Sequence, residues 1–352
     1  MNLDFFKEKT ILITGNTGFK GSWLSEILYL SGANVIGYGL EPSEKSLYNI
    51  LKLNDKVTTI YGDIRNLDLL TETINKYKPE IVIHMAAQPL VLESYKNPHY
   101  TFETNIMGTV NILEVTRKTN YVKSFLNVTT DKVYLDTQNI DSEGYKETDR
   151  LCGKDPYSNS KSCSEMVTYS YIKSFFEELE YPRISTARSG NVIGGGDFSE
   201  NRIIPDCIKS ALNNEPIKIR NPHSIRPYQH VLECLKGYLI IVEKQYKNKD
   251  YSGNYNFGPD SKDCITTEEL VKIFCKKWGN QQYINVNENK NKESSYLKLN
   301  SDLAIKKLNW TRTWNIEKSV EAIVEWTKCY SNKEDIIKKT DEQIKEYFEI
   351  GE

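Results

Sequence analysis

Two short polar segments carry the residue types that could do chemistry in this chain. Tyr157 and Lys161 are four residues apart, so they share one face if their segment is helical. A lysine ammonium beside a phenol favours the phenolate, which suits Tyr157 as a base near neutral pH. The second segment, Thr129-Thr130-Asp131-Lys132, adds hydroxyls, an acid and an amine after an apolar run. A plain dehydrogenase needs only the Tyr/Lys pair, so the additional acid and amine indicate a second proton transfer after an oxidation.

A glycine-rich turn early in the chain predicts a dinucleotide site. It follows a β-branched run and precedes a helical segment, as the strand–turn–helix phosphate motif requires. The glycines supply a tight turn and close backbone approach to a pyrophosphate at the helix N-terminus. The predicted contacts are Gly15, Asn16, Thr17, Gly18, Phe19, Lys20 and Gly21.

The residues after the next strands refine the cofactor prediction. An acid that would hold the adenosine ribose is expected near Gly39 but is absent, and Glu41 comes slightly late. No arginine replaces it, which favours NAD over NADP. Asp63 follows the third strand and could meet the adenine. Ala86, Ala87 and Gln88 follow the fourth strand, where backbone could approach the cofactor.

The elements that must position these residues alternate between strands and helices. Apolar, β-branched runs predict strands at residues 10–14, 34–40, 57–61, 80–84, 124–129 and 183–188. Helices are predicted at 21–31 and 100–119. This alternation predicts an α/β fold with a Rossmann-type, doubly wound parallel sheet. We assign residues 1–190 to an NAD-binding domain that carries the catalytic residues.

The regular alternation of predicted strands and helices does not continue in the second half of the chain. Loop signals at residues 194–197 and 221–228 interrupt it, and helices are predicted at 267–278 and 316–330. Residues 333–349 predict an amphipathic helix that packs on this region or on a partner. We assign residues 191–352 mainly to a smaller, mixed α/β substrate-binding region, with some segments returning to the Rossmann domain.

Composition excludes several other classes of protein. The 352 residues have a net charge of −2, which recruits neither nucleic acid nor an anionic membrane. Seven scattered cysteines without CxxC spacing fit a reducing cytoplasm, and no residue cluster has metal-ligand spacing. We find no signal-peptide pattern and no apolar run near the ~20 residues of a membrane helix. The expectation is a cytoplasmic enzyme without a metal.

With these residues in place, the chain resembles the extended short-chain dehydrogenase/reductase superfamily and, more narrowly, the CDP-glucose 4,6-dehydratases. The resemblance runs along almost the whole chain. In the first half it rests on TGNTGFKGSWL (residues 14–24), HMAAQP (84–89), TTDK (129–132) and Tyr157 with Lys161. In the second half it rests on GNVIGGGD (190–197), Arg202 with Pro205, and IRNPHSIRPYQHV (219–231). The Asp-Lys pair and the second-half strings are the narrower signals.

The resemblance implies a reaction in three stages on a nucleotide sugar. Tyr157 takes the C4 hydroxyl proton while a hydride leaves for NAD, and Thr130 hydrogen-bonds the same oxygen. Water is then lost across C5 and C6, and the hydride returns to C6, so the NAD is regenerated and need not dissociate. Asp131 is the acid at C6, which requires that it hold its proton near neutral pH. We propose Lys132 as the C5 base, which requires a neutral amine. The resemblance also places Ile64 and Asn105 at the cofactor.

A nucleoside diphosphate needs cations that fork onto phosphate oxygens, and Arg226 and Arg202 are the main candidates. By resemblance Asn191 donates to a phosphate. Arg220 is a weaker candidate, and Tyr228 could stack on a pyrimidine. Gln88 and Ile203 complete the expected substrate set.

The sequence departs from the family beside the substrate. Val133 stands where the family has a cysteine, and Tyr228 stands where it has a tryptophan. The family also has an acidic-alanine pair near the position of Ser294-Ser295, where this chain has two serines. Three alternatives therefore stay open: a dehydratase of another nucleotide sugar, a nucleotide-sugar 4-epimerase or oxidase, and a non-catalytic NAD-binding regulator. The family pairs through helices beside the active site, so we expect a homodimer or homotetramer through residues 100–119 and 157–177.

Overall fold

The main sheet of this protein is parallel throughout and positions the predicted chemistry along one edge. The structure, a computed structural model, describes residues 1–136, 143–286 and 297–350. Within these ranges the sheet has seven strands in the order β11-β6-β5-β4-β1-β2-β3. Their bounds are β1 Thr10–Thr14, β2 Asn34–Gly39, β3 Thr58–Tyr61, β4 Ile81–His84, β5 Ser124–Val128, β6 Arg183–Ser189 and β11 Asn254–Phe257. The predicted Rossmann-type fold is confirmed, and the six predicted strands agree with the observed ones to within a residue at each end.

The seventh strand is one that the sequence did not predict. β11 lies at the sheet edge, and its residue Asn254 is aligned with Thr186 of β6. Its sequence, NYNF, has no β-branched residue and alternates asparagine with aromatic side chains, so it lacks the signal that marked the other strands. It is a second-half segment that joins the sheet of the first half.

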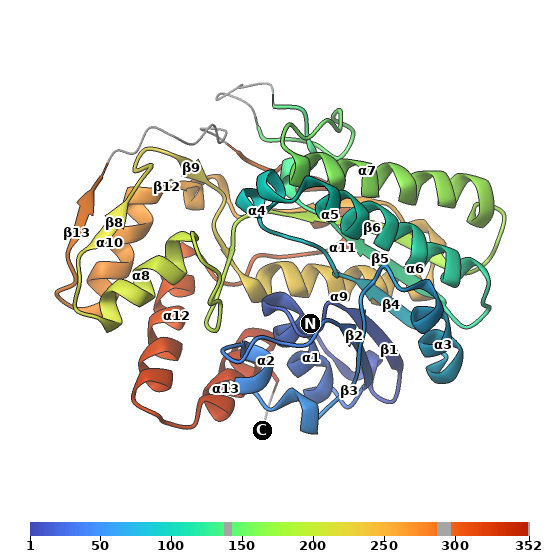
Figure 1. Cartoon of the computed structure of the whole chain (residues 1–352), viewed down its shortest axis with the longest axis horizontal. Helices are drawn as coiled ribbons and strands as arrows, with labels where there is room; N and C mark the ends of the chain where they lie inside the picture. Colours follow the sequence, from blue (N-terminus) through green and yellow to red (C-terminus); the bar gives the residue numbers. More distant parts are fainter. Residues whose placement is uncertain (137–142, 287–296, 351–352) are drawn as a thin grey trace.

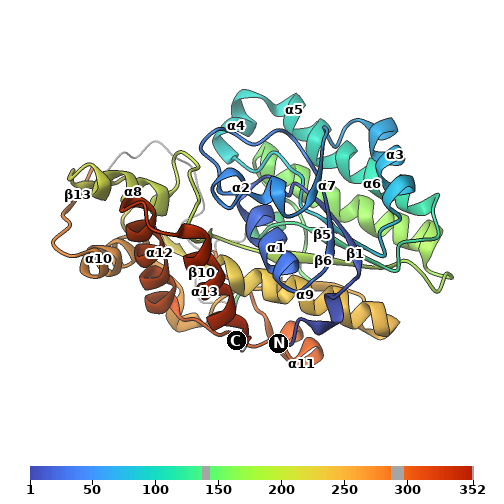
Figure 2. The same ribbon diagram turned by 90° about the horizontal axis from the view of Figure 1, so that it is seen from below.

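Helices cover both faces of the sheet, as Figures 1 and 2 show. On one face, α1 (Phe19–Leu30) and α9 (Val231–Lys247) pack on Ile11, Ile13 and Leu126. On the other, α3 (Leu67–Tyr77), α6 (Gly108–Arg117) and α7 (Pro156–Tyr171) enclose Leu12, Val82 and Phe125. Alternate strand residues thus serve opposite cores, which explains why the strand sequences are apolar throughout.

The predicted helix at residues 100–119 has three parts. It consists of α5 (Pro98–Phe102), a π-helical turn at Glu103–Met107, and α6. In α6, Gly108 packs against Ile64, where an added Cβ would lie 2.6 Å from the isoleucine side chain. Because Gly108 has no side chain, the start of α6 packs directly against Ile64 in the segment that follows β3.

A smaller lobe, at the left in Figure 1, is built from second-half segments. Its own apolar core joins α8 (Ile203–Leu212), β8 (Ile217–Ile219), α10 (Thr267–Trp278) and α12 (Ile316–Ser331). A capping box between Thr266 and Glu269 starts α10 where the sequence predicted it. The lobe also contains β13 (Tyr283–Asn285), which pairs with β8. The shorter elements of the chain are α2 Leu47–Ile50, α4 Val91–Lys96, β7 Val192–Ile193, β9 Ile225–Arg226, β10 Gln229–His230, β12 Ile265–Thr266 and α11 Asp302–Leu308.

The last helix, α13 (Ile336–Phe348), packs against α12. Its residues Ile344, Tyr347 and Phe348 are buried in the core that also contains α1 and α9. The expected amphipathic tail is therefore docked within this chain. None of the helices in the described ranges is both long and apolar enough to cross a bilayer.

Candidate active site

The glycine turn lies where the sheet order reverses between β1 and β4, which is where open α/β sheets bind ligands. Gly15 has φ +77°, and a Cβ there would come 2.8 Å from the Ala86 nitrogen. A Cβ on Gly21 would lie 2.1 Å from the Gly15 carbonyl oxygen, so α1 can pack this closely only with glycine. Gly18 immediately precedes α1. This arrangement fits a dinucleotide pyrophosphate at a helix N-terminus.

Side chains of the turn fasten it to the neighbouring strands. Asn16 is buried, and its Nδ2 donates to Thr59 Oγ1 at 2.9 Å. Thr17 Oγ1 donates to the Leu40 carbonyl oxygen at 2.8 Å. Asn16 therefore fastens the turn to β3 and Thr17 fastens it to the end of β2, and direct contact of their side chains with a cofactor stays a prediction.

Asp63 and Ile64, predicted to contact the cofactor, follow β3. The Asp63 carboxylate accepts from Arg65 Nε at 3.0 Å and from Arg65 Nη2 at 2.8 Å, and these hydrogen bonds lower the pKa of Asp63. Ile64 is buried against Gly108. Asp63 keeps part of its surface exposed, so a bond to adenine remains a prediction.

The segment after β4 is held by Asn105. Asn105 Oδ1 accepts from the Gln88 backbone nitrogen at 2.8 Å, and its Nδ2 donates to the Gln88 carbonyl and to Ser160 Oγ. The Gln88 side chain bonds to Leu90 and Thr101. Both amides are engaged within the protein, and their direct contacts with cofactor or substrate stay predictions. Ala86 lies against Gly15, so this segment and the glycine turn meet at the same place.

Helix α7 carries the Tyr/Lys pair at its N-terminal end. Asp155 caps it by accepting from the Ser158 nitrogen at 2.9 Å, and Pro156 occupies its first turn. Tyr157 faces the pocket described below, whereas Lys161 is buried one turn further along.

The expected effect of Lys161 on Tyr157 differs from what the structure gives. Lys161 Nζ donates to the Val128 carbonyl oxygen at 3.2 Å. Burial lowers the pKa of Lys161 to about 8, and the charge of Lys20 acts in the same direction. Burial raises the pKa of Tyr157 to about 12, although a hydrogen bond with Thr130 opposes the shift. Desolvation outweighs the neighbouring charges, so the phenol is protonated at neutral pH in this structure.

The acid and amine follow β5 in a short 3₁₀ turn, Asp131–Val133. Thr130 Oγ1 donates to Asp131 Oδ1 at 3.0 Å, and Lys132 Nζ lies 3.8 Å from the same oxygen. The Asp131 side chain is fully buried, and its Oδ2 has no hydrogen-bond partner within the described ranges. Asp131 therefore combines a buried carboxyl with an uncommitted oxygen, whereas the Lys132 side chain is 30% exposed.

These residues line a pocket of about 440 Å³, a volume that suits a small organic ligand. Thr130, Asp131, Lys132 and Tyr157 form part of its wall. The predicted substrate residues join them from the second half of the chain: Asn191, Arg202, Ile203, Arg220, Arg226 and Tyr228. The predicted catalytic and substrate residues, separated in sequence, thus share one pocket, except Gln88, which does not line it, and Lys161, which is buried behind its wall. In the described part of the chain, no three His, Cys, Asp or Glu residues are grouped to hold a metal.

The arginines of the pocket differ in how they are held. Arg202 Nη1 lies 3.3 Å from Asp197, and Arg220 Nη2 lies 3.0 Å from Asp206. Arg226 is buried and donates to the Ile225 carbonyl at 3.0 Å. Tyr228 is also buried, with its hydroxyl 3.1 Å from Thr267 Oγ1. The pocket therefore offers three guanidinium groups to an anionic ligand.

Other residues at the site were assigned differently or missed by the sequence analysis. Lys20 also lines the pocket, and its Nζ donates to Ser189 Oγ and Tyr238 OH, while its predicted contact with a cofactor stays a prediction. Glu165 and Arg188 form a buried ion pair beneath the pocket. The signal for Glu165 was its spacing of four from Lys161, which places both on one face of α7.

Comparison with known proteins gives the family. The model of the GDP-mannose 4,6-dehydratase family matches residues 12–323. A CDP-glucose 4,6-dehydratase of Salmonella typhimurium is 41% identical over 98% of this chain and 97% of its own. The chain belongs to the GDP-mannose 4,6-dehydratase family.

Solved structures agree with this family fold at lower identity. A UDP-glucose 4-epimerase of Thermotoga maritima has a TM-score of 0.80 at 23% identity, over 92% of this chain and 99% of its own. A dTDP-glucose 4,6-dehydratase of Streptomyces venezuelae, with NAD bound, has a TM-score of 0.78 at 20% identity, over 93% and 99%. The fold is thus common to epimerases and dehydratases, so the reaction must be argued from the site.

Proposed function

We propose that this protein is an NAD-dependent CDP-glucose 4,6-dehydratase, which forms CDP-4-keto-6-deoxyglucose. The observation that carries the proposal is the buried Asp131 carboxyl, with Lys132 beside it and Tyr157 on the same pocket. An epimerase needs the tyrosine and the cofactor but has no water to eliminate. The 41% identity to a CDP-glucose 4,6-dehydratase over nearly the full length of both chains supports the choice of nucleotide sugar.

The glycine turn, the N-terminus of α1 and the Ala86 segment fit NAD. When bound, NAD supplies the ability to accept a hydride from C4 and return it to C6. Tyr157 must first lose its own proton, because its pKa is raised; the phenolate then takes the C4 hydroxyl proton, and Thr130 hydrogen-bonds the same oxygen. Lys132 removes the C5 proton while Asp131 gives its proton to the C6 hydroxyl, which leaves as water. Lys132 then returns its proton to C5, and the C4 proton held by Tyr157 replaces the one that Asp131 gave to the departing water, so the cycle loses only water.

The substrate cations suit a nucleoside diphosphate. Arg202, Arg220 and Arg226 reach the pocket from three separate segments of the second half. Guanidinium groups fork onto phosphate oxygens, which makes them better suited than lysines to a diphosphate. We assign phosphate binding to these arginines and to Asn191, and packing beside the base to Tyr228 and Ile203. Residues 1–190 thus supply the cofactor site and reaction chemistry, and residues 191–352 mainly the nucleotide-sugar site. The family departure near Ser294-Ser295 lies outside the described residues.

The experiment that tests the function is mass spectrometry of CDP-glucose after incubation with the purified protein and NAD. UDP-, GDP- and dTDP-glucose serve as parallel substrates. Loss of one water from CDP-glucose alone supports the proposal. Water loss only from another nucleotide would keep the reaction and change the substrate, whereas an altered sugar stereocentre at unchanged mass would make the protein an epimerase.

A homo-oligomer is also part of the proposal. Met107 in the π-helical turn is exposed, as are Met166 and Tyr169 on α7 and Phe175 just beyond it. These large apolar side chains lie on the segments where the sequence analysis placed the subunit interface. We propose that a second copy covers them, which sedimentation or light scattering would detect. A cytoplasmic location stays a prediction.

A further inference from the structure

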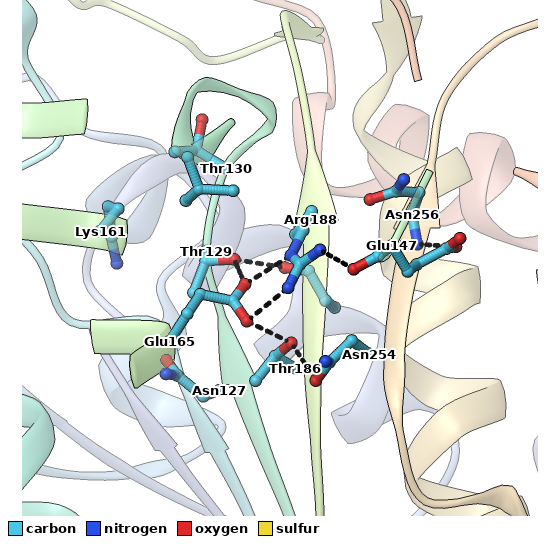
Figure 3. A network of polar contacts seen from close by, with 12 residues as sticks. Asn127, Thr129, Thr130, Glu147, Lys161, Glu165, Thr186, Arg188, Asn254 and Asn256 are labelled. Atoms are coloured by element: carbon cyan, nitrogen blue, oxygen red, sulfur yellow. Dashed lines mark hydrogen bonds and ion pairs between the residues drawn. The ribbon is translucent and has the colours of Figure 1, made fainter. Parts of the chain in front are cut away.

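A buried ion pair lies beneath the pocket and contacts both the strand and the helix that carry the proposed reaction. Glu165 Oε1 accepts from Arg188 Nε at 2.8 Å, and its Oε2 accepts from Arg188 Nη2 at 2.9 Å. Both side chains are nearly inaccessible, with exposed fractions of 3% and 1%. Figure 3 shows the carboxylate and the guanidinium facing one another between β5 and β6. Neither residue lines the pocket, so neither can contact the substrate there.

The pair connects the elements on which the catalytic residues lie. Glu165 is on α7, two turns beyond Tyr157 and one turn beyond Lys161. Thr129, directly before Thr130 and Asp131, donates its hydroxyl to Glu165 Oε1. Arg188 is in β6, whose continuation at Ser189, Gly190 and Asn191 lines the pocket. The Glu165 carboxylate therefore links α7, which carries Tyr157, to the segment after β5 that carries Asp131.

Further hydrogen bonds surround this carboxylate and the guanidinium. Thr186 Oγ1 donates to Glu165 Oε2 at 2.7 Å, and Arg188 Nη1 donates to Tyr134 OH at 2.7 Å and to the Glu147 carbonyl at 3.1 Å. A bidentate pair with these further hydrogen bonds favours one geometry, which a pair of apolar side chains would not impose. The cost of burying two charges makes such a pair weak evidence for stability alone.

We infer that Glu165 and Arg188 are positioning residues for the dehydration: they fix α7 against the ends of β5 and β6 so that Tyr157 and Asp131 face the same sugar. The inference rests on the proposed function, because it assumes that Tyr157 and Asp131 act on one substrate. Misplacing a reacting group by about 1 Å can cost on the order of 100-fold in rate, so the register of these elements matters.

The first test removes one link and leaves the pair intact. Thr129→Val keeps the shape of the side chain but deletes its bond to Glu165. Thr340→Val is the matched control, because Thr340 is equally buried and hydrogen-bonded to Trp326, far from the pocket in α13. We expect kcat of Thr129→Val to fall about tenfold or more with KM within about threefold, since positioning acts on the reacting atoms. An unchanged kcat in Thr129→Val would overturn the inference.

The second test measures how the negative charge of Glu165 affects the pH dependence of kcat. This anion raises the pKa of the nearby Lys161, so Glu165→Gln is expected to lower that pKa further and move the alkaline limb of the kcat profile to lower pH. A purely structural role would lower the unfolding temperature and leave the shape of the profile unchanged, and that result would contradict our inference. If Glu165→Gln does not fold, the Thr129→Val measurement still decides.

The wild-type enzyme distinguishes a failure of the proposed function from a failure of the proposed positioning role. If it fails to remove water from CDP-glucose, the proposed function is at fault. If it removes water and Thr129→Val does so at the same rate, the function stands and the positioning role fails.

Discussion

Gly190 packs against the Asp131 carboxyl, and this packing allows a quantitative prediction. A Cβ on Gly190 would lie 1.8 Å from Asp131 Oδ2 and 2.4 Å from its Cγ. Since uncrowded heavy atoms sit about 3.5–4.0 Å apart, Gly190→Ala must move the carboxyl by more than about 1 Å. A displacement of this size predicts a loss on the order of 100-fold in water elimination, or about 2.7 kcal/mol in the barrier.

The effect is expected at the elimination step and not at C4 oxidation, because the three heavy atoms nearest the new methyl group all belong to Asp131. Stopped-flow absorbance of bound NADH reports oxidation, and mass spectrometry of quenched samples reports water loss. Gly190→Ala should accumulate NADH while product formation slows. Gly258→Ala is the control, since the nearest neighbours of its Cβ would be Leu299, at 3.1 Å, and Ser301 Oγ, at 3.7 Å, neither of which lines the pocket.

A double-mutant cycle isolates the cause. If Gly190→Ala acts by displacing Asp131, adding it to Asp131→Asn should slow elimination no further. Water loss at the native rate in Gly190→Ala would refute the reasoning. Additive losses in the double variant would show that the alanine acts through some other residue.

Three further predictions follow from the same geometry. Asp131→Asn should leave C4 oxidation intact and slow water loss with bound NADH accumulating, whereas Tyr157→Phe should abolish the NADH signal; stopped-flow absorbance separates them. Arg226→Lys keeps the charge but loses the fork, so KM for CDP-glucose should rise about tenfold with kcat nearly unchanged in steady-state assays. Burial of Glu26 raises its pKa to about 7, so the folded state binds the proton more tightly and stability should fall as pH rises from about 4.5 to 7, by on the order of 3 kcal/mol. Glu26→Gln should flatten that slope in denaturant unfolding, and an unchanged slope would assign it to other groups.

The sheet was predictable because most of its strands can be recognised from their own short sequences. A strand covered on both faces is apolar throughout, and residues 10–14 or 124–128 contain that signal without reference to any other part of the chain. β11 was missed because its place in the sheet depends on pairing with β6 and on the cover that α9 provides, not on its own residues. Long-range pairing of this kind has no counterpart in a short sequence window.

The mutual placement of the candidate catalytic residues could be predicted for a different reason. Tyr157 and Lys161 lie within one helix, and Thr130, Asp131 and Lys132 lie within one turn, so their mutual placement is local. Their proton affinities could not be predicted, because these depend on burial by distant segments. The phenol of Tyr157 was expected to be acidified, yet desolvation raises its pKa instead.

Lys20 shows where a motif stops being informative. Its place in the glycine turn predicts a backbone that contacts a dinucleotide, and nothing in the turn says where its long side chain points. In the fold, Lys20 at the start of α1 and Tyr157 at the start of α7 line the same pocket, and the Lys20 side chain donates to Ser189 and Tyr238. There its charge lowers the pKa of Lys161, and its own pKa is lowered by burial. A residue that the motif assigns to the cofactor thus helps to set the protonation of the lysine behind Tyr157, which couples the cofactor turn to the proton chemistry of the substrate pocket.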